Sequence, residues 1–176
     1  MDFKNKNEIS FVLGTKAQLI KCKFILKYFA DKNYKIIIID TGQHIEITQR
    51  ELHFLKNNYV YINVSKNRKN VSSIPGMIFW FFKIIFKKNK IAELENSNLL
   101  LVHGDTISTL IGLIIGKKNK KKVVHIEAGY SSGTWLKPFP EEIVRAIVTK
   151  FSDIICIDNV NNKKNIERII KSKFLI

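Results

Sequence analysis

The chain alternates short, continuous apolar runs with longer stretches whose apolar residues recur at helical spacing. Strands that are apolar on both sides are typical of a parallel sheet covered by helices on both faces, and the four isoleucines at 36–39 are the clearest case. We expect strands in six runs: residues 9–13, 36–39, 59–64, 99–103, 121–127 and 153–157. The β-α-β order predicts an α/β fold, a Rossmann-like parallel sheet with helices on both faces.

Helical spacing fills most of the intervals between these runs. Helices are expected over about residues 16–31, 45–56, 106–116, 160–171 and from Pro140 to 151. The aromatic segment 77–86, followed by lysines, predicts another helix. It is too short to cross a bilayer, which needs about 20 apolar residues. We favour a core helix with a basic carboxyl end over an aromatic helix lying on a membrane surface.

Length and composition favour one domain, residues 1–176. Hydrophobic residues make up 45%, which is a globular composition. Thirty Lys+Arg against fifteen Asp+Glu give a net charge of +15, which permits phosphate-bearing partners. The densest basic run, 117–122, lacks the interleaved aromatic residues that single-strand binders use. We therefore expect a solvated lysine surface and no nucleic-acid partner.

Cys22 and Cys156 are the only cysteines, and their wide spacing predicts neither a disulfide framework nor a metal site. Cys156 lies in an apolar run, where a small buried residue is expected. The four histidines show no paired ligand spacing. The amino terminus is polar, without a secretory apolar region. We expect a cytoplasmic protein with no transmembrane segment, no metal and no cofactor.

Polar residues follow the ends of four expected strands, at the edge where open parallel sheets bind ligands. They occupy positions 14–16 with Lys21, 40–44, 103–106 and 125–129. Glu127 has the strongest functional signal among them because it closes an apolar strand. Its carboxylate is expected at the crevice or buried, and burying a charge is costly without a partner.

The other candidates each have a structural alternative. Lys16 and Lys21 fit ordinary surface lysines, and the Gly-Thr pair before them is neither a dinucleotide fingerprint nor a Walker A loop. Asp105 or Thr106 fits the cap of the following helix. His103 and His125 fit core hydrogen bonding, and Glu141 and Glu142 follow a proline as acids do at a helix start.

Five segments in order resemble the UDP-N-acetylglucosamine 2-epimerase family: 14–21, 41–44, 102–106, 125–129 and 138–142 with Arg145. The resemblance covers about residues 9–170, nearly the whole chain. It implies the amino-terminal domain of a two-domain, glycosyltransferase-B-like fold. Since family members have a second domain, we expect the carboxyl-terminal domain to be absent here or separately encoded. Little or no activity is then expected from this chain alone.

The resemblance implies the non-hydrolysing interconversion of UDP-GlcNAc and UDP-ManNAc, in making precursors of surface polysaccharide. In that chemistry UDP is eliminated to leave a 2-acetamidoglucal and is then added back. The alternatives are a hydrolysing epimerase that releases ManNAc and UDP, or a non-catalytic module that binds nucleotide sugars. The UDP-sugar is the expected partner, and members of the family commonly form homodimers through this domain. The aromatic segment 77–86 offers an apolar face for a dimer or for the missing domain.

Three acids, Asp105, Glu127 and Glu141, match the family's catalytic carboxylates, with base and acid left unassigned between them. Lys16 and Lys21 match basic positions near the diphosphate, where they would stabilise charge on the departing UDP.

Gly104 and His125 fall in the matching segments and are expected to bind substrate, while Gln43 and His44 match a region that contacts a regulatory second UDP-GlcNAc in some bacterial members. Two departures concern arginine. The family's Gly-Thr-Arg-Pro-Glu is Gly-Thr-Lys-Ala-Gln at 14–18, and its Glu-Ala-Gly-Leu-Arg ends in Ser131 here. Lysine cannot copy the bidentate grip of arginine.

Overall fold

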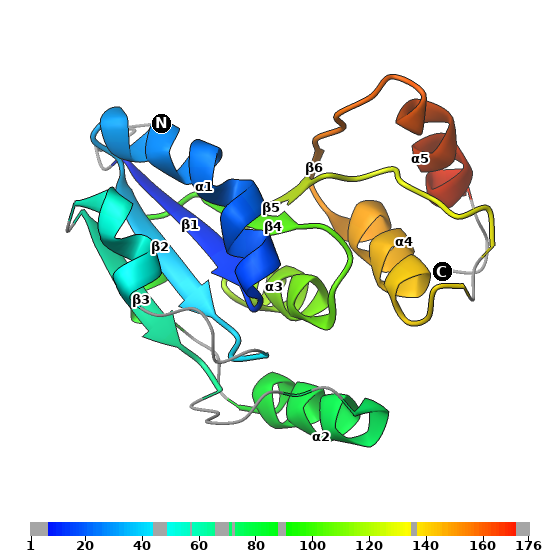
Figure 1. Ribbon diagram of the computed structural model, residues 1–176, viewed down its shortest axis with the longest axis horizontal. Helices are drawn as coiled ribbons and strands as arrows, with labels where there is room; N and C mark the ends of the chain where they lie inside the picture. Colours follow the sequence, from blue (N-terminus) through cyan, green and yellow to red (C-terminus); the bar gives the residue numbers. More distant parts are fainter. Residues whose placement is uncertain are drawn as a thin grey trace.

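Six parallel strands form one sheet in the order β3-β2-β1-β4-β5-β6 (Figure 1). The computed structural model describes residues 7–43, 49–56, 58–65, 71, 73–87, 91–134 and 137–171. The strands are β1 (Glu8–Leu13), β2 (Lys35–Asp40), β3 (Tyr59–Asn63), β4 (Leu99–His103), β5 (Lys122–Ile126) and β6 (Ile154–Ile155). The strand order reverses between β1 and β4, and ligands of such sheets bind at this switch point. The expected Rossmann-like sheet is confirmed.

Helices connect the strands and lie on both faces of the sheet (Figure 1). They are α1 (Lys16–Asp31), α2 (Ile74–Ile85), α3 (Ile107–Lys118), α4 (Glu141–Phe151) and α5 (Asn162–Lys171). The helix expected over 45–56 is a 3-10 helix, η1, at Gln49–Leu55, and residues 44–48 lie outside the described part. A second 3-10 helix, η2 (Ala92–Leu94), was not expected.

The run of isoleucines in β2 shows why the strands are continuously apolar. Ile36 and Ile38 pack with the core under α1 and η1, whereas Ile37 and Ile39 pack with the core under α2, α3 and α4. All four side chains are fully buried. Burial of each one contributes about 1.5–3 kcal/mol, so both helical layers are fixed to the same strand.

Helix α3 lies close to the sheet because a glycine faces it. A Cβ at Gly112 would lie 2.5 Å from Val102 Cγ1 and 3.0 Å from Val12 Cβ. This close approach holds the middle of α3 against β1 and β4.

The expectation that Cys156 is buried is wrong, and the core-helix interpretation of segment 77–86 is confirmed for one side of the helix. Cys156 is exposed, because β6 is only two residues long at the sheet edge and the cysteine follows it. The aromatic helix α2 is a core helix on one side only: Trp80 and Ile84 are buried, but Phe79 and Phe86 are 72% and 81% exposed. None of the helices in the described residues is long and apolar enough to cross a membrane.

Candidate active site at the carboxyl edge of the sheet

The site forms where β4 and β5 end beside the start of α4. After β4 the chain turns at Gly104, whose φ of +70° is readily adopted by glycine. After β5 it turns at Glu127, whose φ is +62°. The left-handed conformation costs about 1–2 kcal/mol in a residue with a Cβ. Such strain is found most often where a side chain is held for a function.

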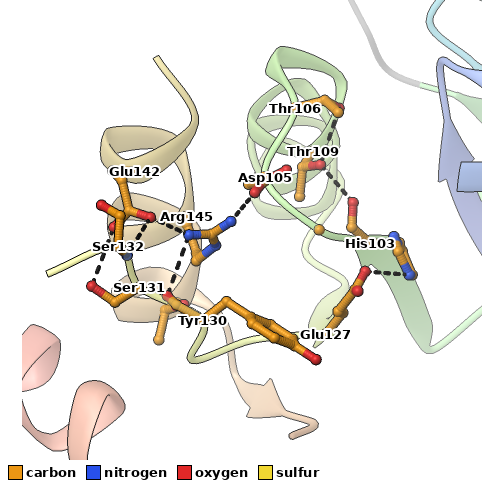
Figure 2. Close-up of polar contacts among 12 residues, drawn as sticks. His103, Asp105, Thr106, Thr109, Glu127, Tyr130, Ser131, Ser132, Glu142 and Arg145 are labelled. Atoms are coloured by element: carbon orange, nitrogen blue, oxygen red, sulfur yellow. Dashed lines mark hydrogen bonds and ion pairs between the residues drawn. The ribbon is translucent and has the colours of Figure 1, made fainter. Parts of the chain in front are cut away.

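The carboxylate of Glu127 is bound by two cationic or titratable groups from neighbouring elements. Lys21 Nζ, from α1, lies 2.7 Å from Oε1 and 2.9 Å from Oε2. His103 Nε2, at the end of β4, lies 3.0 Å from Oε2 (Figure 2). Burial lowers the pKa of His103, and the charge of Glu127 partly opposes that change. The Glu127 side chain is 26% exposed, so this cluster is open to a ligand.

Asp105 is held from the other side by Arg145 of α4 (Figure 2). The same guanidinium pairs with Glu142, and its Nη1 donates to the carbonyl of Tyr130 at 3.3 Å. The side chains of Arg145 and Glu142 are only 13% and 7% exposed. Arg145 therefore joins the turn after β4, the loop after β5 and helix α4.

His125 supports the turn at Gly104 from within the core. Its ring is fully buried, with Nε2 2.8 Å from the Gly104 carbonyl oxygen and Nδ1 3.2 Å from Thr149 Oγ1. Burial lowers the pKa of His125 to about 4. The ring is therefore neutral near pH 7, with Nε2–H donating to the carbonyl and Nδ1 accepting from the hydroxyl.

Gln18 ties the turn after β1 to the turn after β4. Its Oε1 accepts from the Gly14 amide at 2.9 Å, and its Nε2 donates to the His103 carbonyl at 2.8 Å. The same Nε2 lies 3.1 Å from Thr106 Oγ1. Both polar ends of this buried amide are satisfied, so the two turns keep a fixed separation.

The structure brings Lys21, but not Lys16, to the carboxylates. Lys16 Nζ lies 3.1 Å from Glu51 Oε1 of η1. Glu141 begins α4, and its Oε2 is buried with no hydrogen-bond partner in the described part of the chain.

Gln43, the expected regulatory residue, is buried and its Oε1 accepts from the Ser108 hydroxyl at 2.6 Å. The same hydroxyl lies 2.8 Å from Thr41 Oγ1. The second expected regulatory residue, His44, lies outside the described residues.

Asp105 does not cap helix α3, contrary to the structural alternative given for it. Thr106 is the N-cap of α3 and makes no side-chain capping bond, while the Asp105 carboxylate faces Arg145. Arg145 lies in a segment that matches the family and Glu142 fits a helix-start acid, but neither was expected to be a site residue. Their i, i+3 spacing on one helix was the available signal.

The strand order defines a Rossmann-like α/β domain, and charged side chains of both signs gather at the carboxyl ends of its central strands. Over the described ranges, no cluster of three or more His, Cys, Asp and Glu could hold a metal ion. A model of the UDP-N-acetylglucosamine 2-epimerase family matches residues 27–175. The chain belongs to this family of isomerases, whose fold is glycosyltransferase-B-like.

Similar proteins extend the comparison. The UDP-N-acetylglucosamine 2-epimerase homolog of Methanococcus maripaludis is 30% identical over 84% of this chain and 40% of that protein. The UDP-2,3-diacetamido-2,3-dideoxy-D-glucuronate 2-epimerase of Pseudomonas aeruginosa is 28% identical over 89% of this chain and 44% of that protein. The Methanocaldococcus jannaschii UDP-GlcNAc 2-epimerase, solved in complex with UDP-GlcNAc and UDP, superimposes with a TM-score of 0.74 at 25% identity, covering 96% of this chain and 45% of that one. The chain thus spans less than half the length of these relatives.

Proposed function

We propose that this chain supplies the amino-terminal half of the active site of a non-hydrolysing UDP-GlcNAc 2-epimerase. The reaction interconverts UDP-GlcNAc and UDP-ManNAc and would supply precursors of surface polysaccharide. The observation that carries the proposal is the binding of Glu127 by Lys21 and His103, beside Asp105 and Arg145. Membership of the family and the UDP-GlcNAc-bound relative support the choice of substrate.

Each charged group has a task in elimination and re-addition of UDP. Breaking the anomeric C–O bond builds positive charge on the sugar, which the carboxylates of Asp105 and Glu127 stabilise. Lys21 stabilises the negative charge of the departing diphosphate. The C2 proton is weakly acidic, so its removal and return need a closely placed acid and base. Glu141, whose buried Oε2 has no hydrogen-bond partner among the residues that the structure describes, is our candidate for proton transfer.

The experiment compares this chain alone with this chain mixed with the separately produced carboxyl-terminal half of a relative. UDP-GlcNAc is supplied in deuterated water, and the products are followed by NMR. We expect little turnover alone, and UDP-ManNAc carrying deuterium at C2 from the mixture. Release of free ManNAc and UDP would instead support the hydrolysing alternative. Robust turnover by this chain alone would contradict the proposal that it forms half of the site.

Substitutions in the mixture test the named residues. Glu127→Gln, Asp105→Asn and Glu141→Gln should each lower turnover at least a hundredfold, the usual scale for a lost acid, base or charge stabiliser. Lys117→Gln is the matched control, since Lys117, at the end of α3, pairs with Asp153 and has no expected role in the site. Binding of UDP-GlcNAc with no turnover in any mixture, unaffected by these changes, would favour a non-catalytic binding module. UDP-2,3-diacetamido-2,3-dideoxy-D-glucuronate is the comparison substrate, because one relative is named for it.

We also propose a cytoplasmic location and a homodimer formed through α2. Both cysteines are free thiols, as a reducing compartment favours.

The proposed dimer interface is the exposed side of α2. This side and the neighbouring Phe139 line an apolar hollow of about 180 Å³ with residues of α3. Phe79→Ser with Phe82→Ser should convert a dimer to a monomer in light scattering, and an unchanged mass would rule this interface out.

A further inference from the structure

Helix α1 presents an apolar ridge on the molecular surface, opposite its buried side. Leu19, Cys22 and Leu26 face the sheet and are buried. Ile20, Phe24 and Tyr28 are 60%, 82% and 59% exposed. Residues four apart lie on one face of a helix, so the three side chains form a ridge about 12 Å long. In Figure 1, α1 lies on the outside of the sheet layer.

Lysines border this ridge on both sides. At about 100° per residue, Lys16, Lys23 and Lys27 fall on one side, and Lys21 and Lys32 fall on the other. The segment 16–32 thus contains five lysines and one acidic residue, Asp31.

Three of the lysines have no carboxylate partner among the described contacts. Lys23 Nζ lies 5.5 Å from the centroid of the Phe54 ring, and Lys32 Nζ lies 5.9 Å from that of Tyr28. Lys27 is the third lysine with no carboxylate partner among these contacts. Lysine stems pack along apolar surface while their ammonium groups reach outward, which leaves these three charges available to an anionic surface.

The shape of the ridge favours one class of partner. Single-stranded nucleic acids are bound in concave basic grooves with stacking platforms, whereas this surface is a convex helical ridge with an aliphatic residue at one end. Aromatic and aliphatic side chains flanked by lysines are typical of helices that lie in the lipid interface. A hollow of about 320 Å³ beside the ridge is lined by Lys16, Leu19, Ile20, Lys23, Glu51 and Phe54. Its one carboxylate, on Glu51, is paired with Lys16, so Lys23 is the lysine there without a carboxylate partner among the described residues.

We propose that the α1 ridge binds the surface of an anionic lipid bilayer. Ile20, Phe24 and Tyr28 insert at the level of the acyl-chain boundary, and Lys23, Lys27 and Lys32 lie against lipid phosphates. This binding does not depend on the epimerase proposal, since no residue that inserts touches the carboxylates of the site.

The test is co-sedimentation of the purified chain with vesicles of phosphatidylcholine, with and without phosphatidylglycerol. We expect binding only when phosphatidylglycerol is present. Changing Ile20, Phe24 and Tyr28 together to Ser should lower the partition coefficient at least about tenfold. Changing Lys23, Lys27 and Lys32 to Gln should lower it about 100-fold, since each lysine near an anionic surface contributes about fivefold. Asp31→Lys should strengthen binding by about fivefold or more.

A matched control changes exposed apolar residues elsewhere. Val160→Ser with Ile170→Ser, on the loop before α5 and on α5, removes side chains that are 79% and 50% exposed and should leave vesicle binding unchanged. Circular dichroism and an unchanged thermal midpoint confirm that each variant is folded. The proposal is overturned if the Ser variant of the ridge binds as the parent does, or if the parent binds neutral vesicles equally well. It also fails if the ridge variants alter only self-association while no vesicle binds.

Discussion

At the scale of single residues, Glu127 combines a strained backbone with a bound carboxylate. Its φ of +62° places it where glycine is favoured, yet its side chain contacts Lys21 and His103. Replacing the side chain therefore has two effects, loss of the ion pair and a change in backbone strain. The contribution of backbone strain can be measured by comparing two variants that both lose the ion pair.

Glu127→Gly and Glu127→Ala both lose the carboxylate, but only the glycine variant relieves the left-handed conformation. We expect the glycine variant to have the higher free energy of unfolding, by about 1 kcal/mol. Urea unfolding of the two proteins measures this difference. An alanine variant as stable as the glycine variant would show that Glu127 carries no backbone strain.

His125 makes stability depend on pH. Its pKa is about 4 in the folded protein and about 6.5 in an unfolded chain, so the unfolded state binds more protons between these values. The free energy of unfolding should therefore fall as pH is lowered from about 6.5 to about 4, by up to on the order of 3 kcal/mol. His103, whose pKa is also lowered, adds in the same direction.

Urea unfolding between pH 4.5 and pH 7, read as a slope against pH, tests this contribution. The variant His125→Asn should show a shallower slope whatever its absolute stability, because it lacks the titrating ring. The His125 ring resonances should also not titrate between pH 7 and 5. Titration in that interval would contradict a buried neutral ring.

At the scale of elements, helix α3 carries the turn of Asp105 because it lies close against β1 and β4. The approach depends on Gly112, where an added Cβ would meet Val102 and Val12 side chains. Well-packed cores rarely absorb an added methyl group without strain.

Gly112→Ala should therefore lower the free energy of unfolding by about 1–3 kcal/mol, although alanine is the better helix former. Gly76→Ala in α2 is the matched control, because its Cβ would meet the hydroxyl at the end of the exposed Ser73 side chain, which can rotate, and otherwise only Val71 Cγ1 at an ordinary 3.8 Å. That change should be neutral or stabilising. Equal effects at the two sites, measured by denaturant unfolding, would mean that α3 can move away from the sheet.

The elements differ in how well their own residues predict them. The isoleucines of β2 and the helical spacing of α1 were sufficient to predict these two elements. In each, the local order of apolar residues fits one type of secondary structure. The residues of η1 also carry helical spacing, but form a 3-10 helix. In β6, the expected strand of 153–157 is reduced to Ile154–Ile155, because its only strand partner among the described residues is β5.

At the scale of the whole molecule, the net charge of +15 sets how the chain meets polyanions. A charge excess spread over surface lysines binds phosphates without reading sequence. It provides no shape that selects nucleic acid.

Any binding to duplex DNA should therefore be independent of sequence and fall at least about a thousandfold between 50 and 200 mM salt. Fluorescence anisotropy with two unrelated duplexes measures both properties. Sequence preference, or affinity that persists at the higher salt, would contradict the expectation of no nucleic-acid partner.

The sequence by itself determined the parallel sheet, the strands at its core and the edge at which charged residues gather, because these follow from local periodicity and from the rule for parallel strands. Only the tertiary structure decided which charges meet. Lys21 reaches Glu127 across 106 residues of chain, while Lys16 turns to Glu51, and Arg145 pairs with Asp105 on a different element. Such pairings depend on the direction of each side chain after packing, and no local pattern contains that information.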